Sequence, residues 1–275
     1  MIRAVSKTPV VLALTLGSVL FMMPFFVMVS MSLKSPEELA RTSVLAWPVA
    51  PTLENYRFVL ANPTISFQLF FRNTVVIAIL TTLGTLASSA VVAYGFARMK
   101  FAGRDRLFLL LLATMMLPGI VTMIPSYVIF ARLGWVNTYL PLVVPSFFAA
   151  AYNVFLLRQF FLNLPRELDE AAMLDGASPW EIFARIVLPL SGPALMTVGI
   201  FAFIYNWRDF MGPLLYLNEP DKLTLETGLR LYQSQNDDQW HLIMAASTLV
   251  SVPLVVLFFL GQKAFIRGIV MTGGK

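Results

Sequence analysis

The chain contains no cysteine and a single histidine, His241, among its 275 residues. Without cysteine it can form neither a disulfide framework nor a thiolate metal site, and we expect no metal site at His241. Charge is scarce as well, since 13% of the residues are charged and 58% are hydrophobic. A soluble domain is roughly a quarter charged. These shortages exclude an ordinary water-soluble domain and indicate a chain whose surroundings are lipid.

The formal net charge is +5, a sign that can accompany nucleic-acid binding. Here the basic residues are scattered between apolar runs and do not cluster on one surface. Basic residues that flank membrane spans explain this distribution better. We therefore expect contact with membrane lipid and no nucleic-acid partner.

Six apolar segments are long enough to cross a bilayer, which takes about 20 residues in a helix. They cover residues 10–33, 74–97, 107–130, 139–161, 186–207 and 242–261. Several contain proline, which membrane helices tolerate where neighbouring groups satisfy the freed carbonyls. The sequence predicts an all-α, polytopic membrane protein of six transmembrane helices that forms a single domain over residues 1–275.

The orientation follows from the distribution of Lys and Arg, which collect in cytoplasmic loops. Segments 1–9, 98–106, 158–185 and 262–275 hold twelve of the 20 basic residues, and the loops on the opposite side hold eight. We expect a multi-pass protein of the cytoplasmic (inner) membrane with both termini in the cytoplasm. The first apolar run exceeds the roughly 7–15 residues of a signal-peptide core, so we expect it to be retained as a span.

Arg158 is counted here with the cytoplasmic segment 158–185. The six segments then contain no Asp, Glu, Lys, Arg or His. Proton- or ion-driven pumps usually need such groups within the membrane. A phosphate-binding loop is missing too, because Gly273-Gly274-Lys275 lacks the upstream glycine and the Ser or Thr that follows the lysine. The energy for any transport must therefore come from a partner.

A polar insert, residues 164–185, separates two of the apolar segments. Pro165 suits a first helical turn, and Gly176 stands where helices commonly end with positive φ. Ser178 and Glu181 have the spacing of a capping box at the start of a second helix. We predict two short helices, a hairpin that the physics alone does not distinguish from an ordinary amphipathic element at the membrane surface.

Residues 170–189 read E-A-A, three residues, Gly, nine residues and I-x-L-P without a mismatch. In this stretch the chain resembles the membrane permease subunits of bacterial ATP-binding-cassette (ABC) importers, whose signature is this cytoplasmic loop. The resemblance implies that the hairpin 164–185 is a coupling element that sits in a cleft of an ATPase subunit and passes its movement to the membrane helices. Carried over by position, the docking residues are Glu170, Ala171, Ala172, Asp175, Gly176, Ala177, Ile186, Leu188 and Pro189.

Weaker similarities run along nearly the whole chain: Asn73-Thr74, residues 134–138, residues 206–210 and Trp240. They resemble the carbohydrate-importing branch, in particular its shorter, maltose-type permease of the binding-protein-dependent transport inner membrane family. The C-terminal residues 271–275 depart from the usual ending of that branch.

The resemblance implies a non-catalytic permease subunit of an ATP-driven importer that moves a sugar or oligosaccharide by alternating access. Glycerol phosphate, an amino sugar or another small polar solute is the alternative. The chain itself would carry no cofactor, because ATP and Mg would be bound by the partner ATPase. The implied partners are a second homologous permease, two ATPase subunits and an extracytoplasmic solute-binding protein.

Sugars are held by aromatic stacking and by amide and hydroxyl groups. For each candidate in this chain, packing between helices is the alternative. The candidates for the solute path are Ser126, Tyr127, Tyr152, Asn153, Tyr205 and Asn206. A membrane enzyme would need a cluster such as Asp237-Asp238 beside His241, and a channel or structural protein is a third class that stays open.

Overall fold

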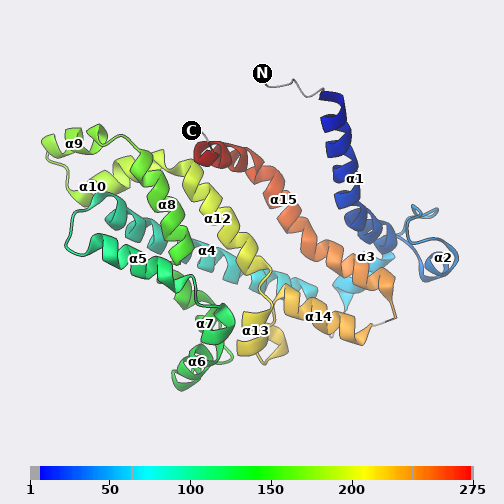
Figure 1. Ribbon diagram of the computed structural model, residues 1–275. Coiled ribbons are helices and arrows are strands. Elements are labelled where there is room, and N and C mark those ends of the chain that lie inside the picture. The colour runs from blue at the N-terminus through cyan, green and yellow to red at the C-terminus, as the bar shows by residue number, and fades with distance from the viewer. Residues whose placement is uncertain (1–6, 63–64, 237, 274–275) are drawn as a thin grey trace. The chain divides into compact units, whose positions relative to one another are not determined.

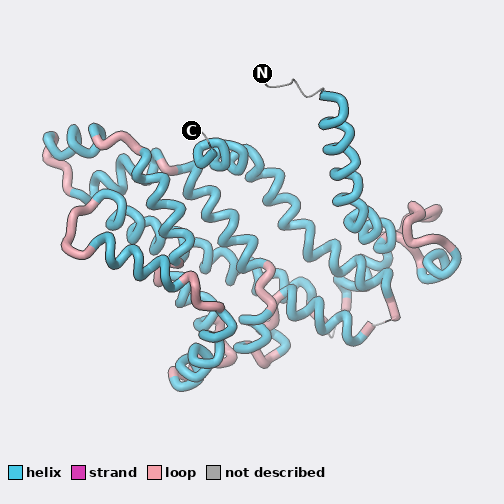
Figure 2. The backbone as a smooth tube through the Cα atoms, in the orientation of Figure 1, coloured by secondary structure: helices cyan, strands magenta, loops and turns pink. Residues whose placement is uncertain are grey.

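The computed structural model describes residues 7–62, 65–236 and 238–273, which contain helices and no strand (Figures 1 and 2). The all-α prediction is therefore confirmed for this part of the chain. The α-helices are α1 (Lys7–Ser32), α2 (Pro36–Arg41), α3 (Glu54–Ala61), α4 (Phe67–Arg98), α5 (Arg104–Thr114), α6 (Gly119–Arg132), α7 (Leu140–Val143), α8 (Ala151–Asn163), α9 (Glu167–Leu174), α10 (Pro179–Ile182), α11 (Leu188–Leu190), α12 (Gly192–Trp207), α13 (Met211–Tyr216), α14 (Leu225–Gln235) and α15 (Trp240–Gly273). Short helical turns of other types are η1 (Val144–Phe147), η2 (Phe183–Val187) and η3 (Pro220–Lys222).

Four stretches are long and apolar enough to cross a membrane as they stand: Thr8–Ser32, Phe67–Arg98, Leu140–Asn163 and Trp240–Gln262. They correspond to four of the six predicted segments. The other two predicted segments are sharply bent. The pair α5 and α6 turns by 94°, and the pair Pro179–Leu190 and α12 turns by 78°. The described residues thus contain four candidate spans, or six if each bent pair is one span.

Proline and its neighbours account for the positions of the two bends. Pro118 lies in extended backbone directly before α6, and proline disfavours helical geometry in the residue before it. Gly192 and Pro193 are the first residues of α12. Proline has no N–H, but in the first turn of a helix this group would have no partner within the helix. The sequence placed the fifth span at 186–207. In the structure one helical run continues from Pro179 to Leu190, and the break comes at Ser191.

The described helices form two compact units. One comprises Met1–Gln68 and Gly228–Pro253, and the other comprises Leu69–Thr227 and Leu254–Lys275. In the first unit the segment after α1 is held tightly. The buried Lys34 donates from Nζ to the carbonyl of Ser43 at 2.8 Å, and the Asn55 amide donates to the carbonyls of Ser32 and Lys34 at 2.8 Å each.

The second unit has its core around the last turns of α4. Ala90, Ala93 and Ala97 are buried there, and their small side chains let neighbouring helices approach closely. Both α5 and α12 pack against α8 in the same unit (Figure 1). The buried members that other elements add to this cluster are Val154, Leu157 and Phe161 of α8, Ile182 of α10, Phe183 and Val187 of η2, and Val198 of α12.

Arg158 corrects one expectation. The sequence analysis counted this residue with the connecting segment 158–185, but it lies in α8, within the candidate span Leu140–Asn163. Its guanidinium carbon is 4.1 Å from the centroid of the Phe108 ring, and its Nε donates to the carbonyl of Phe96 at 3.3 Å. One of the candidate spans therefore carries a cation near its end, with the stem packed on apolar groups.

Candidate functional site

The first candidate site is the hairpin, residues 164–185, between α8 and the membrane helix α12. Its first helix, α9, ends at Leu174, and Gly176 follows the C-cap Asp175 with a φ of +83°. Glycine adopts this conformation without the steric cost that other residues meet. The turn is closed by the N–H of Ala177, which donates to the carbonyl of Ala172 at 2.9 Å. The predicted helix end at Gly176 is confirmed.

The second helix of the hairpin, α10, begins with the predicted capping box. Glu181 N donates to Ser178 Oγ at 3.3 Å, and Ser178 N donates to Glu181 Oε2 at 3.0 Å. The prediction for Pro165 was wrong in detail, because α9 begins at Glu167 with Arg166 as its N-cap. After α10 the chain passes through a π-helical turn, Phe183–Val187, before α11.

The signature residues divide by exposure. Ala172, Ala177 and Leu188 are partly buried and pack against the unit's core, and Ile186 is partly buried as well. The others lie on the surface: Glu170, Ala171, Asp175, Gly176 and Pro189. Between the exposed members Leu174 is 90% exposed, and Trp180 is exposed as well. The hairpin thus presents small and apolar side chains, together with the carboxylates of Glu170 and Asp175, to its surroundings.

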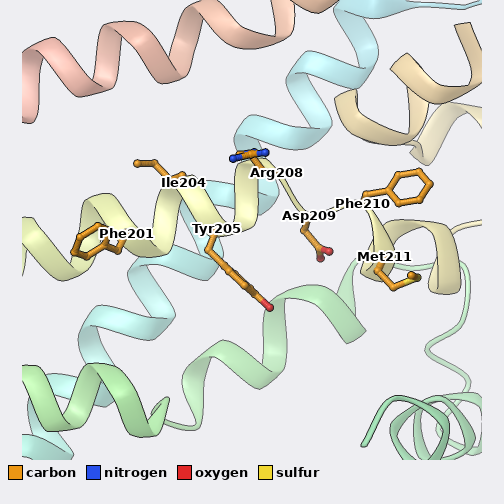
Figure 3. Close-up of a pocket in the computed structure, with 7 residues that line it drawn as sticks. All are labelled: Phe201, Ile204, Tyr205, Arg208, Asp209, Phe210 and Met211. Atoms are coloured by element: carbon orange, nitrogen blue, oxygen red, sulfur yellow. The ribbon is translucent and has the colours of Figure 1, made fainter. Parts of the chain in front are cut away.

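A second candidate site is a pocket of about 540 Å³ at the far end of α12. Figure 3 shows Tyr205 reaching out from α12, with its hydroxyl on the same side of the helix as the carboxylate of Asp209. The Tyr205 side chain is 78% exposed. The residues that line the pocket are Phe201, Ile204, Tyr205, Arg208, Asp209, Phe210 and Met211.

Of the six predicted solute-path residues, Tyr205 is the one that lines this pocket. Asn206 donates from its amide to the carbonyl of Ala202 in its own helix, at 2.7 Å. Tyr127 on α6 stacks on Tyr216, with ring centroids 6.0 Å apart.

Ser126 on α6 and Asn153 on α8 are half-buried, and Tyr152 on α8 is exposed. None of these three belongs to the pocket lining. The structure therefore does not bring the six residues together at one place. Of the alternative enzyme cluster, Asp237 lies outside the described residues.

Asp209 is a pocket residue to which the sequence analysis gave no role. Its Oδ1 accepts a hydrogen bond from the N–H of Gly212 at 3.1 Å, at the start of α13. A Cβ added at Gly212 would collide with the carboxylate of Asp209 and come within 2.9 Å of Leu142, so the glycine leaves room for this acid. Burial raises the pKa of Asp209, and the backbone N–H groups of Gly212 and Met211 act in the opposite direction. The signal in the sequence was an acid two residues after the end of an apolar segment.

The segment between α13 and α14 is held by Asn73 and Asn137, which belong to the weaker sequence similarities described above. Asn73 donates from its amide to the carbonyls of Asp221 and Leu223 at 2.8 and 2.9 Å. Asn137 Oδ1 accepts from the N–H groups of Asn218 and Glu219 at 3.2 Å each. Their place in the sequence pattern therefore has a structural explanation, since both satisfy backbone groups of an irregular loop.

Comparison with known proteins gives a consistent result. Residues 89–271 match the family model described as "Binding-protein-dependent transport system inner membrane component". The trehalose/maltose transport system permease protein MalG of Thermococcus litoralis is 37% identical over 220 residues, which cover 79% of each chain. The arabinooligosaccharides transport system permease protein AraQ of Bacillus subtilis is 33% identical over 260 residues, 94% of this chain and 92% of that one. The sn-glycerol-3-phosphate transport system permease protein UgpE of Salmonella typhi is 33% identical over 263 residues, 94% and 93% of the two chains.

Among solved structures, a chain of a bacterial ABC transporter involved in the import of the acidic polysaccharide alginate has the same fold. The TM-score is 0.83 at 22% sequence identity, and the match covers 96% of this chain and 98% of that chain. The family match spans well over half of the protein, and the relatives above exceed 30% identity over most of its length. The chain belongs to the family of binding-protein-dependent transport system inner membrane components, which are membrane permease subunits of transporters and not catalysts.

Proposed function

We propose that this chain is the permease subunit of an ATP-driven, binding-protein-dependent importer that carries a sugar or oligosaccharide across the cytoplasmic membrane. Two of the relatives are named for trehalose/maltose and for arabinooligosaccharides, and the solved transporter of the same fold is described as an alginate importer. The observation that carries the proposal is the complete signature on an exposed hairpin that leads into a membrane helix.

The hairpin is the docking element for the ATPase in this proposal. Its exposed alanine and glycine positions let another backbone approach closely, and the exposed Leu174 and Trp180 supply apolar area. ATP and Mg are bound by the partner subunits, because the sequence contains no phosphate-binding loop. The assembly also comprises a second homologous permease, two ATPase subunits and an extracytoplasmic solute-binding protein. Both termini and the hairpin face the cytoplasm in this proposal, which the distribution of basic residues favours.

The pocket at the end of α12 supplies a solute contact in this proposal. The Tyr205 ring offers an aromatic face, and the Asp209 carboxylate offers an acceptor for hydroxyl groups on the same side of the helix (Figure 3). Mostly apolar pockets with a few placed polar groups are typical of small-molecule sites. Arg208 in the pocket wall favours a second candidate, a phosphorylated polyol. The relative named for sn-glycerol-3-phosphate supports that alternative.

Reconstitution tests the proposal. Vesicles that contain the chain with its second permease and ATPase subunits are loaded with ATP and given the binding protein and radiolabelled maltotriose, arabinotriose or sn-glycerol-3-phosphate. We expect uptake of one of the two oligosaccharides, dependent on ATP and on the binding protein, and unchanged when the proton gradient is collapsed at constant ATP. Uptake of sn-glycerol-3-phosphate alone would favour the second candidate. Uptake of any of the three solutes by the chain alone under an ion gradient would refute the proposal.

A further inference from the structure

The two arms of the hairpin are attached to the rest of their unit by different forces. The second arm, α10 and η2, is anchored by apolar packing: Ile182, Phe183 and Val187 are buried in one cluster with Ala93 and Ala97 of α4. The first arm, α9, has no fully buried residue, and its contribution to this cluster is the partly buried Ala172. An eight-residue helix is too short to be stable by itself in water. Because the apolar contact of one alanine is small, the position of α9 depends largely on polar contacts.

Arg98, the last residue of α4, makes these contacts. Its Nη1 lies 3.1 Å from Oδ2 of Asp169 in the first turn of α9, and the side chains of Arg98 and Asp169 are 4% and 13% exposed. Its Nη2 donates to the carbonyl of Leu164, just before α9, at 2.8 Å. One buried guanidinium thus fixes both the entry of the chain into α9 and the first turn of that helix.

A second contact joins α4 to the other arm one turn earlier. The Tyr94 hydroxyl donates to the carbonyl of Pro179 at 2.9 Å, and the Tyr94 ring lies 4.9 Å from that of Phe183. The last two turns of α4 are therefore fastened to both arms of the hairpin. The arms differ in what remains when a contact is lost: the second arm keeps its buried apolar cluster, whereas α9 keeps the smaller apolar contact of Ala172.

We infer that Arg98 is a positioning residue for the docking surface: through Asp169 and the Leu164 carbonyl it sets the orientation of α9 and makes the hairpin move together with α4. This inference rests on the proposed function, in which α9 carries the docking residues Glu170, Ala171 and Ala172. Arginine suits the task because its planar guanidinium holds two partners in fixed directions, here the Leu164 carbonyl through a hydrogen bond from Nη2 and Asp169 through an ion pair of Nη1 that lacks hydrogen-bond geometry. Apolar contacts define an orientation less sharply, since they have no preferred direction.

The first test measures the attachment itself and needs no partner. Hydrogen exchange is followed on the full chain in lipid nanodiscs for the wild type, D169N and R98M. We expect the amides of 167–174 to lose protection by tenfold or more in both variants, while those of 182–187 keep theirs. The matched control is R104M, which removes the ion pair of the partly exposed Arg104 Nε with the exposed Asp105 Oδ1 at 3.1 Å and a long hydrogen bond to the Met99 carbonyl, and is expected to change neither segment. Unchanged protection of α9, or an equal loss in both arms, would contradict the inference.

The second test measures the consequence in the complete transporter, as solute taken up per ATP hydrolysed. D169N and R98M are expected to lower this ratio by at least fivefold, and the reversed pair R98D/D169R to recover part of it. The reversed pair restores the ion pair but not the bond to the Leu164 carbonyl, so recovery should be incomplete. A normal ratio in D169N and R98M, or no recovery in the reversed pair, would overturn the role of this ion pair.

The hairpin's docking role can fail independently of the role of Arg98. In G176D the attachment of α9 to α4 is intact, and loss of ATPase binding in that variant reports on docking alone. If G176D still binds the ATPase, the proposed function of the hairpin fails. If G176D loses the ATPase while D169N and R98M transport normally, docking stands and only the inference about Arg98 fails.

Discussion

The hairpin and the pocket lie at opposite ends of the same membrane helix, α12, and are built in opposite ways. The hairpin presents small and apolar side chains, with Leu174 almost fully exposed. The pocket groups aromatic residues around a half-buried acid, Asp209, and a basic residue, Arg208, and the ring of Tyr205 is largely exposed. A flat, exposed surface suits a protein partner, and a recess with few polar groups suits a small solute.

The length of α12 bears on where the hairpin and the pocket lie in the membrane. Its 16 residues span roughly 24 Å at 1.5 Å per residue, most of the hydrocarbon core of a bilayer, which is about 30 Å thick. In the orientation proposed above, the hairpin lies on the cytoplasmic side and the pocket toward the outside. In the proposed function, the partner surface thus precedes the 78° bend at the start of α12, and the solute contact lies at the far end of that helix. This comparison would be contradicted if both sites lay on the same side of the membrane. It would also be contradicted if the hairpin contacted the solute or the pocket bound the ATPase subunit.

The largest expected effect is all-or-none chemical labelling, which reports on which side of the membrane each site lies. The chain has no cysteine, so single cysteines introduced at Gly103 or Asp175 should react with an impermeant maleimide only from the cytoplasm. Cysteines introduced at Leu45 or Lys222 should react only from outside. Labelling of intact cells against inverted vesicles measures this. Reaction of the residue-175 probe from outside would overturn both the orientation and the comparison.

The second prediction addresses the hairpin as a partner surface. G176D and E170K are expected to leave the chain in the membrane and to lower solute uptake at least tenfold, with loss of the co-purified ATPase subunit. At Gly176 any side chain meets a positive φ, which costs about 1–2 kcal/mol, and projects from an exposed turn.

Gly103 provides a matched control for the strain at Gly176. It has φ of +80°, and a Cβ there, as at Gly176, would meet nothing within 4 Å. G103D therefore adds the same side chain and a similar strain outside the signature. We expect G103D to retain uptake. Equal losses in G103D and G176D would attribute the effect to backbone strain, and normal uptake in G176D and E170K would remove the docking role.

The hairpin could be predicted from the sequence because its determinants are local. The capping box spans four consecutive residues, and the positive φ of Gly176 depends on the end of a single helix. The ion pair of Arg98 with Asp169 could not be predicted in this way. Its members are far apart in the sequence, and the apolar periodicity of α4 does not specify which loop its last residue meets. The same holds for Arg158, which the sequence assigned to a loop and the structure places in a helix.

The pocket was only partly predictable, for a related reason. An apolar helix gives little indication of its rotation, so Tyr205 and Asn206 were equal candidates although they are neighbours on the helix. The structure distinguishes them, since Tyr205 lines the pocket and Asn206 bonds to its own helix. The prolines Pro118 and Pro193 lie at the two bends in the spans, but the sequence did not indicate that the helical run before the second bend begins as early as Pro179.

The third prediction concerns the pocket as a solute contact. Y205A should raise the apparent KM for the transported sugar about three- to tenfold, the range that corresponds to one lost aromatic contact, while Y205F should stay near the wild type. Binding of the ATPase subunit should be unchanged in both. Y152A is the matched control, because Tyr152 is an exposed tyrosine outside the pocket. A raised KM in Y152A together with a normal KM in Y205A would move the solute path from α12 to α8.

The smallest expected effect is the pH dependence contributed by Asp209, whose pKa is raised by burial. Because the folded-state pKa lies above the unfolded value, the folded chain binds more protons in the window between the two. The stabilising contribution of this group is therefore complete below the unfolded pKa of aspartate and is lost as the pH rises through the raised folded-state pKa. In thermal unfolding at a series of pH values, wild type and D209N should differ in slope within that acidic window and run parallel above it. A slope that D209N leaves unchanged would show that Asp209 is not desolvated, and that the pocket is open to water at the position where a solute hydroxyl should bind.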